Sequence, residues 1–276
     1  MKIPEIFIPE TDLKDEVQKL LKEHSEYFND KATAKKIRHE IESKIGFEGG
    51  LAKHDTTPNV YSYDSSLVAI LDCLLGNETN ARRIRDTIEE KIGFNGILVR
   101  VGIGNDFDAP VYSNAFYALL DYLLSDKTIA RRRRDYLQRY FNGGLIKNVT
   151  HGNWYTIDNT SFAVLDWLLG KERRANDVKD EIMTKIGFNG SLVKQGMGFD
   201  HLHTSDSASF AILDYLLGNE AQAVTIRKEL EERIGFDNGL IKNGLGEHIY
   251  ADALYTCNSA LYGILCLAER LKSYKK

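Results

Sequence analysis

The stretch IGFEGGL, residues 45–51, decides the architecture of this chain because it returns four more times. The later copies are IGFNGIL from Ile92, YFNGGLI from Tyr140, IGFNGSL from Ile186 and IGFDNGL from Ile234. Their phenylalanines follow one another at intervals of 47, 47, 47 and 48 residues: Phe47, Phe94, Phe141, Phe188 and Phe236. A constant period of this length indicates an array of like structural units.

Each unit predicts two helices of different character. The helix before the repeated stretch is charged with one apolar stripe, as in residues 77–94, and the glycine after its last isoleucine predicts a left-handed C-cap. A loop of about twenty residues follows, and then a helix that is apolar nearly all round, which predicts burial on most sides. The apolar segments are residues 65–76, 114–125, 159–170, 207–218 and 259–270.

These helices predict an all-α fold with an inner apolar layer and an outer charged layer. The long loops all fall at one end, since the connections from apolar to charged helices are short. An open α-solenoid needs polar terminal repeats, and the last apolar helix is nearly as apolar as the others, so we expect a closed α/α toroid. The predicted single domain is 1–276, with repeats at about 29–76, 77–125, 126–170, 171–218 and 219–273 and an N-terminal helix at about 11–28 that completes the ring.

Composition excludes several classes of protein. The 276 residues are 43% apolar and 28% charged with a net charge of −4, which is typical of a globular chain and gives no reason to expect nucleic acid as a partner. No apolar run approaches the roughly twenty residues of a membrane span, and residues 1–10 do not resemble a secretory signal. We therefore expect no membrane partner and a cytoplasmic location. The run Arg131–Arg134 is expected on a solvated helix face.

Cysteine usage agrees with that location. Cys73, Cys257 and Cys266 are three in number and scattered, so we expect no disulfide framework and interpret them as buried small apolar residues.

The repeat pattern resembles that of protein prenyltransferase β subunits and terpenoid cyclases. The segments that carry the resemblance are residues 141–170 and 237–267, in which a Gly-rich element and a polar loop precede an apolar helix. The resemblance implies an α/α toroid with a ligand cavity at one mouth. Its catalytic motifs are not matched: Tyr255 stands before Thr256 and Cys257 where the prenyltransferase zinc site has a histidine, and the cyclase-like acids Asp106 and Asp108 come too early. We expect no metal and no cofactor.

One position before each apolar helix carries a small polar residue. Asp64, Ser113, Asp158, Asp206 and Asn258 stand eight residues before Asp72, Asp121, Asp166, Asp214 and Cys266. We interpret them first as N-caps, each accepting a hydrogen bond from the first turn of its own helix. The alternative is that Asp64, Asp158 and Asp206 act as acids or bases at the cavity mouth. Asp72, Asp121, Asp166 and Asp214 lie in apolar helices, so we expect each to pair with a basic side chain of an outer helix.

The long loops are rich in residues suited to ligand binding. Five of the seven histidines fall in them, together with tyrosines, tryptophan and acids that can transfer protons or pack against flat ligands. The predicted ligand-binding residues are His54, Tyr61, Asp108, His151, Trp154, Tyr155, His203, Glu247, His248 and Tyr255. The pair His201 and His203 is a weak metal signal. The glycine-rich stretches from Gly102, Gly196 and Gly244 are expected to be turns.

Three functions remain open. The first is a hydrolase or lyase acting on a carbohydrate or other small molecule, with Asp158 and Asp206 as the best catalytic pair, Asp64 and His201 as further candidates, and Trp154 as a sugar platform. The second is isoprenoid chemistry in a deep barrel lined by Tyr117, Phe162, Trp167 and Phe210. The third is a non-catalytic toroid that binds a peptide or protein through the loop face.

Overall fold

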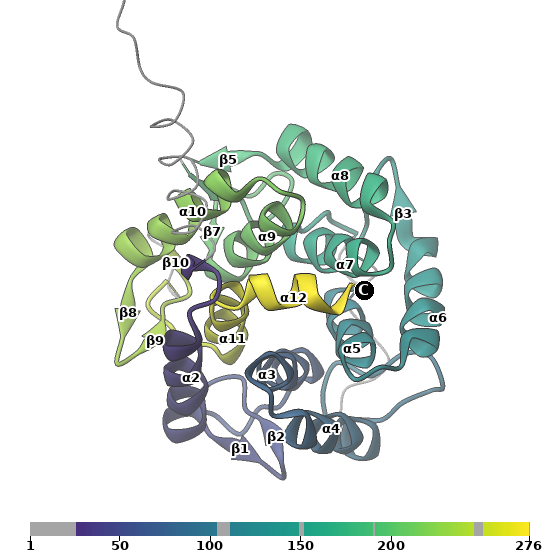
Figure 1. Cartoon of the computed structure of the whole chain (residues 1–276), viewed down its shortest axis with the longest axis vertical. Helices are drawn as coiled ribbons and strands as arrows, with labels where there is room; N and C mark the ends of the chain where they lie inside the picture. The colour runs from purple at the N-terminus through teal and green to yellow at the C-terminus, as the bar shows by residue number, and fades with distance from the viewer. Residues whose placement is uncertain (1–25, 104–110, 149–151, 190, 246–250, 276) are drawn as a thin grey trace, which may run out of the picture.

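The computed structural model describes residues 26–103, 111–148, 152–189, 191–245 and 251–275 as an α/α toroid, which confirms the predicted fold (Figure 1). The inner ring consists of α3 (Ser62–Leu75), α5 (Val111–Leu123), α7 (Thr156–Leu168), α9 (Thr204–Leu216) and α11 (Thr256–Leu265). The outer ring consists of α2 (Lys31–Glu40), α4 (Glu78–Thr87), α6 (Lys127–Leu137), α8 (Glu172–Glu181) and α10 (Glu220–Glu229). The expected N-terminal helix at 11–28 falls almost wholly outside the described residues.

The repeated stretch forms the end of each outer helix and a short hairpin. Most outer helices widen into a last π-helical turn: η1 (Ile41–Ile45), η2 (Ile88–Ile92), η4 (Ile182–Ile186) and η5 (Leu230–Ile234); η3 (Gln138–Tyr140) is a 3₁₀ turn. The helix ends at the glycine, as predicted, but Gly46 has φ 83° with an extended ψ of −171° instead of the left-handed C-cap we expected. The chain therefore leaves the helix directly into an extended segment.

A short hairpin follows most outer helices, in a stretch where we expected only loop. The hairpins pair β1 (Phe47–Glu48) with β2 (Leu51–Ala52), β3 (Phe141–Asn142) with β4 (Leu145–Ile146), β5 (Phe188–Asn189) with β6 (Leu192–Val193), and β8 (Phe236–Asp237) with β9 (Leu240–Ile241). In the second repeat a single bridge joins Phe94 to Val99. Gly49 and Gly50 form the first turn with φ of 57° and 91°, the positive values that a two-residue type I′ turn requires.

The hairpin phenylalanines hold the two rings together. Phe141 packs on Phe162 of α7 with ring centroids 5.0 Å apart, and Phe188 packs edge-on against Phe210 of α9 at 5.2 Å. Arginine side chains of the outer ring cover the same rings, as Arg174 does over Phe141 at 4.2 Å. Packing between the two layers therefore explains why phenylalanine recurs at this position of the repeat.

The last repeat joins the first by the same bonds that link neighbouring repeats within the ring. The Thr156 and Thr204 N–H groups donate to the carbonyl oxygens of Gln195 and Asn243 in the following repeat, at 2.8 and 2.7 Å. At the junction of the chain ends, the Thr256 N–H donates to the His54 carbonyl at 2.8 Å. Helix α11 also packs against both α9 and α3. The ring is closed, and the open solenoid is excluded.

The acids in the inner helices are paired with basic residues of the outer ring, as predicted. Arg38 binds Asp72 through two nitrogens at 2.9 and 3.2 Å, and Arg133 binds Asp121 at 2.8 Å. Arg134 binds Asp166 at 2.5 Å, and Lys179 lies 3.8 Å from Asp214. The expected solvated face for Arg131–Arg134 is therefore wrong for its last two residues, which are 1% and 2% exposed because they turn inward to these aspartates.

The end of the ring opposite the long loops is crossed by α12 (Ala268–Tyr274), which follows the C-terminal end of α11 (Figure 1). The Tyr122 hydroxyl donates to the Tyr274 carbonyl at 3.1 Å, and the Lys275 ammonium lies 3.9 Å from the Trp167 ring centre. The aromatic residues expected to line a deep isoprenoid cavity are instead buried against the outer ring or against this C-terminal segment: Tyr117, Phe162, Trp167 and Phe210. Because these four side chains are at most 6% exposed, they do not form the open, deep cavity expected for an isoprenoid ligand.

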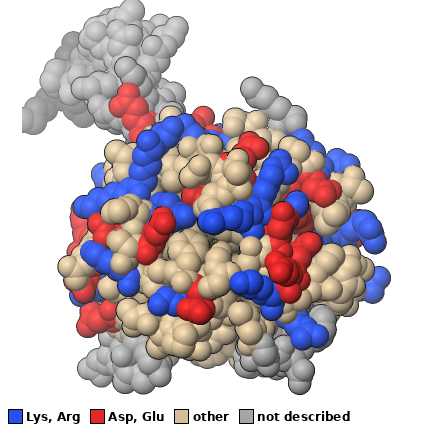
Figure 2. Space-filling model, turned by 90° about the horizontal axis from the view of Figure 1, so that it is seen from below, with Lys and Arg blue, Asp and Glu red and all other residues tan. Residues whose placement is uncertain are grey.

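None of the described helices combines the length and the apolar character needed to cross a membrane. Lysines and arginines alternate with aspartates and glutamates over the face seen in Figure 2, with no extended surface of one sign. That face offers no basic stripe for a polyanion.

Candidate functional site

A cavity of about 290 Å³ lies at the loop end of the ring, between the N-termini of the inner helices. Five long loops converge there because each one leads into an inner helix. The cavity is lined by Tyr63, Tyr112, Asn148, Tyr155, Ile157, Asp158, Gln195, His203, Ser205, Asp206 and Cys257. Two of the predicted catalytic residues, Asp158 and Asp206, thus share one cavity.

The second residue of every inner helix contributes to this cavity. Tyr63, Tyr112, Ile157, Ser205 and Cys257 each follow the serine, threonine or valine that begins the helix. None of the five is among the predicted site residues, although they stand directly before the repeated Asp, Ser or Asn position. That register is the signal that could have identified them.

Asp158 and Asp206 are the third residues of their helices and cap the neighbouring helix instead of their own. The Tyr112 N–H at the start of α5 donates to Asp158 Oδ1 on α7 at 2.8 Å. The Ile157 N–H at the start of α7 donates to Asp206 Oδ1 on α9 at 2.9 Å. The predicted own-helix caps are therefore wrong: the N-cap positions of α7 and α9 are Tyr155 and His203, and the aspartates satisfy orphan N–H groups across the ring.

The two carboxyl groups differ in their surroundings. Asp158 also accepts a hydrogen bond from the Asn148 amide at 3.0 Å, so donors reach both of its oxygens. Asp206 is 2% exposed, and its burial, reinforced by the nearby Asp158 charge, raises its pKa well above 3.8 against a smaller lowering by the Ile157 N–H. The pair thus combines a carboxylate held by two donors with a carboxyl group that favours its protonated form.

Aromatic hydroxyl groups form much of the remaining wall. Burial raises the pKa of Tyr112 and of Tyr63 well above 10.0, so both stay phenols and can donate hydrogen bonds. Tyr63 stands edge-on to Tyr112 with centroids 5.0 Å apart, and Tyr155 stacks on Phe199 at 5.6 Å. Such rings give a rigid, partly apolar surface with polar tips.

A second cavity of about 290 Å³ adjoins the first and shares His203, Ser205 and Cys257 with it. Its wall adds His54 and Tyr255, both predicted ligand-binding residues. His54 Nδ1 lies 2.9 Å from Asp64 Oδ2, and the ring of Tyr255 stacks on His54 at 4.4 Å. Burial raises the pKa of Asp64 to about 6, although His54 opposes this rise.

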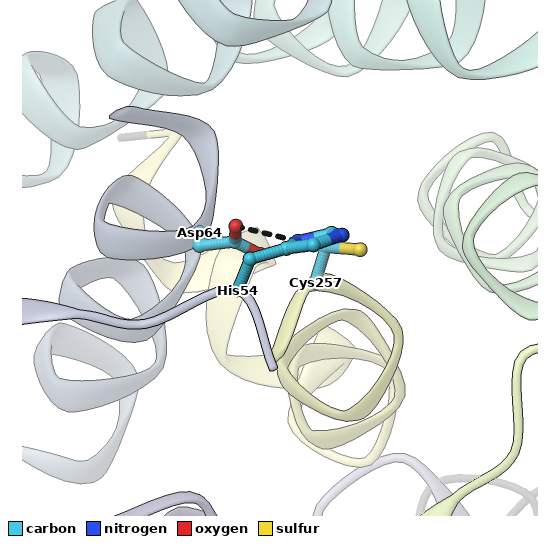
Figure 3. A group of neighbouring side chains, drawn as sticks. All are labelled: His54, Asp64 and Cys257. Atoms are coloured by element: carbon cyan, nitrogen blue, oxygen red, sulfur yellow. Dashed lines mark hydrogen bonds and ion pairs between the residues drawn. The ribbon is translucent and has the colours of Figure 1, made fainter. Parts of the chain in front are cut away.

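Figure 3 shows the side chains of His54 and Asp64 meeting, with the Cys257 sulfur beside the His54 ring; the three come from the first long loop, α3 and the start of α11. One ligand atom from each residue lies within 4.8 Å of the other two. The interpretation of Cys257 as a simple buried apolar residue is wrong, because it is half-buried and lines both cavities.

Several predicted site residues lie away from the cavities. The His201 side chain is exposed, and Trp154 packs under the Lys147 ammonium at 5.5 Å instead of lining either cavity. Tyr61 stacks on Tyr63 at 5.4 Å and supports the wall from behind. The remaining predictions lie outside the described residues: Asp108, His151, Glu247 and His248.

The glycine-rich stretches form bridges between repeats, a role that goes beyond the predicted turns. Gly102 pairs with Tyr61 and Gly196 with Tyr155, while β10 (Gly244–Leu245) pairs with β7 (Leu202–His203). A Cβ on Gly196 would meet the Trp154 carbonyl oxygen at 2.5 Å, so only glycine permits this approach.

Comparison with known proteins identifies the fold. No family model matches the chain, and no curated protein sequence matches it. Similar solved structures include a glycosidase in complex with glucose (TM-score 0.53, 9% identity, covering 91% of this chain and 98% of that one). They also include an α-amylase from Clostridium perfringens (0.54, 10%, 86% and 97%) and a D-mannose isomerase (0.57, 13%, 86% and 78%). At these identities the likeness shows a shared toroid fold.

Proposed function

We propose that the loop-end cavity binds a carbohydrate and that Asp158 and Asp206 act on it as an acid/base pair of the hydrolase or lyase type. The observation that carries this proposal is the placement of two buried carboxyl groups on adjacent inner helices, lining one cavity with unlike hydrogen-bond surroundings. Two carboxyl groups in unlike environments are the usual means of dividing the roles of acid and base.

Asp206 is assigned the role of general acid. Its Oδ1 is occupied by the Ile157 N–H, which leaves Oδ2 to carry the proton that a leaving sugar oxygen receives. Burial raises its pKa well above 3.8, which favours the protonated form that a general acid requires. Burial, the Ile157 N–H and Asp158 are the causes of its pKa shift, whereas basic residues lower the pKa of Asp72, Asp121, Asp166 and Asp214.

Asp158 is assigned the role of base or nucleophile. The Asn148 amide and the Tyr112 N–H both donate to it and therefore suit its ionised form. Tyr112, Tyr155 and Tyr63 supply ring faces and hydroxyl groups of the kind that pack against and orient a sugar. The cavity volume lies near the lower end of the usual range for ligand pockets, about 300 to 1,000 Å³, which favours one or two sugar units over a long chain.

The fold comparisons support the substrate class by analogy. Similar toroids carry the names glycosidase, α-amylase and D-mannose isomerase, and one is in complex with glucose. They give no argument for a particular sugar, so the first screen should span neutral pyranosides and uronic acids.

The test is turnover by the full chain on aryl glycosides, on oligosaccharides by release of reducing ends, and on uronate polymers by formation of unsaturated products. We expect Asp206→Asn and Asp158→Asn each to lower the rate by a factor of about 100 or more. Both variants retain an oxygen for the cross-helix cap, and the chain itself places Asn258 at this register in the last repeat.

Ser113→Ala is the matched control, because Ser113 occupies the same register in α5 but does not line the cavity. We expect it to keep full activity. Equal activity of the wild type and both asparagine variants would overturn the assignment.

The second candidate is non-catalytic binding through the same cavity. It is favoured by the structural role of the aspartates, because cross-helix capping alone explains why Asp158 and Asp206 stand where they do. Saturation-transfer NMR with the same sugars separates the two functions: binding without turnover, retained in Asp206→Asn, would support binding alone.

A further inference from the structure

We propose that His54, Asp64 and Cys257 form a zinc site that joins the first repeat to the last. The site lies beside the carboxyl pair but is independent of the function proposed for that pair. It takes Zn²⁺ by ligand chemistry, since thiolate, imidazole and carboxylate together suit zinc and exclude magnesium and calcium, which prefer oxygen ligands.

Convergence of the three side chains is the first argument. Their ligand atoms lie within 4.8 Å of one another, whereas the ligand atoms of a four-coordinate zinc site lie about 3.5 Å apart given zinc–ligand distances of about 2.0 to 2.3 Å. Closing this difference takes a shift of about 1 Å or less in each side chain. The donors come from a loop, from α3 and from α11, so the grouping depends on closure of the ring.

The buried oxygen of Asp64 is the second argument. Asp64 is fully buried, and its Oδ2 binds His54, while Oδ1 makes no hydrogen bond; the Cys257 N–H is near enough to lower the pKa of the carboxyl group but does not satisfy this oxygen. Leaving a buried acceptor unpaired costs about 1 to 3 kcal/mol. A cation held between Asp64, His54 and Cys257 would satisfy that oxygen.

The surroundings resemble the outer shell of a metal site. Tyr255 stacks on His54 at 4.4 Å, Tyr61 packs edge-on at 5.1 Å, and the Tyr63 hydroxyl lies 3.4 Å from His54 Nδ1. Three tyrosines therefore fix the imidazole plane. Cys257 and His54 both face the second cavity, so a fourth ligand position would open toward it. Three protein ligands with one open position are typical of zinc sites that bind a water molecule or a substrate.

A Cys–His–Asp nucleophilic triad is the competing interpretation, and the geometry disfavours it. In a triad the histidine stands between the other two groups, so the carboxylate and the sulfur lie on opposite sides of the ring. Here the Asp64 oxygen and the Cys257 sulfur are themselves within 4.8 Å. This separation is shorter than a carboxylate–imidazole–thiol line through the two ring nitrogens allows.

Binding releases the thiol proton of Cys257 to solvent as the sulfur–zinc bond forms, with no change of oxidation state. The first measurement is zinc stoichiometry of the chelator-treated full chain after equilibrium dialysis against Zn²⁺. We expect about one zinc per chain, and a loss of affinity of about 100-fold or more in His54→Ala, Asp64→Asn and Cys257→Ser.

Cys73→Ser is the matched control, because Cys73 is a buried cysteine elsewhere on α3, and it should bind zinc like the wild type. We expect Asp64→Asn to fold, because asparagine already occupies the same register in α11 at Asn258. Circular dichroism of each variant confirms the helical ring.

Cobalt substitution identifies the sulfur ligand. We expect Co²⁺ to give a thiolate charge-transfer band that is present in Cys73→Ser and absent in Cys257→Ser. Zinc should also protect Cys257 from iodoacetamide. The proposal fails if zinc retention is equal in the wild type and the three ligand variants, or if Cys257 is alkylated rapidly in a His54-dependent manner that zinc does not slow, which would indicate the triad. None of these readouts uses a sugar, so failure here leaves the carboxyl pair untouched.

Discussion

Asp158 and Asp206 each join two helices of the inner ring through a single carboxylate oxygen. The N–H at the second position of the preceding inner helix donates to that oxygen, and the other oxygen of Asp158 accepts a hydrogen bond from Asn148. At the ring junction burial raises the pKa of Asp64, and the nearby N–H of Cys257 opposes that rise. One register therefore supplies both the caps of helix N-termini and the candidate carboxyl groups of the cavity.

The capping and acidic roles of Asp206 are separable by substitution. At about pH 5, Asp206→Ala should lose about 1 to 3 kcal/mol of unfolding free energy, because the buried Ile157 N–H is left without an acceptor. Asp206→Asn keeps the acceptor and should stay within about 0.5 kcal/mol of the wild type. Urea unfolding measures both values. A loss as large in the asparagine variant as in the alanine variant would contradict the cap.

The sequence revealed these aspartates but not their partners. The repeat register identified Asp64, Asp158 and Asp206 because each precedes the apolar part of a helix. Their bonds to neighbouring helices depend on how the ring curves, which periodicity along one helix does not contain. Cys257 was missed for the same reason, since His54 and Asp64 reach it only across the closure of the ring.

At the scale of secondary-structure elements, three outer helices, α2, α6 and α8, are tied to the inner ring by a basic side chain that pairs with a buried aspartate. Arg133 binds Asp121 at 2.8 Å and lies over the rings of Phe94 and Tyr117 at 4.7 and 4.5 Å. Arg132, its neighbour on α6, is exposed. The run Arg131–Arg134 is thus divided between the exposed and the buried face of α6.

Substitution within this run tests that division. Arg133→Ala should lower the unfolding free energy by about 3 to 5 kcal/mol, because Asp121 would remain buried without its ion-pair partner. Arg132→Ala should change it by less than about 0.5 kcal/mol. Chemical denaturation measures the unfolding free energy of both variants. Equal losses would show that Arg133 and Arg132 do not lie on a buried and an exposed face of α6.

The pairing of the inner acids was predictable because a lone charge in an apolar helix is too costly to leave unpaired. The hairpins were not predicted, because two-residue strands are too short to show alternation. Gly49 and Gly50 form the turn, and the β-hairpin was hidden by the stronger signal of the helix end at Gly46.

At the scale of the whole molecule, the last repeat contacts the first through the same hydrogen bond that joins other neighbouring repeats. The Thr156, Thr204 and Thr256 hydroxyl groups each donate to a lysine carbonyl in the following repeat at 2.6 Å, and the partner of Thr256 is Lys53 in the first repeat.

Threonine-to-valine substitution compares the junction between the last and first repeats with two junctions between consecutive repeats. We expect Thr156→Val, Thr204→Val and Thr256→Val each to cost about 1 kcal/mol, the usual contribution of one hydrogen bond. A negligible cost at Thr256 alone, measured by thermal unfolding, would indicate that the junction frays and that the ring opens there.

The double ring of helices was predictable from the period of the repeat and from the apolar character of the last inner helix. The choice between a filled and a hollow barrel was not, because α12 crosses one end only after the chain has turned at Leu267. Since α12 covers that end, the cavity lies at the loop end, where carboxyl groups, tyrosines and Cys257 line it.

The most direct test of the account is the titration of the Asp206 carboxyl group, followed by ¹³C NMR on aspartate-labelled protein and assigned by loss of the signal in Asp206→Asn. We predict a pKa well above 3.8, because burial disfavours the ionised form of this carboxyl group. Because the folded state then holds a proton that the unfolded chain has lost, this group stabilises the fold below about pH 4 and loses that contribution as the pH rises through its folded pKa. A carboxyl group that titrates at or below 3.8 would be ionised at neutral pH and would contradict its role as the acid of the pair.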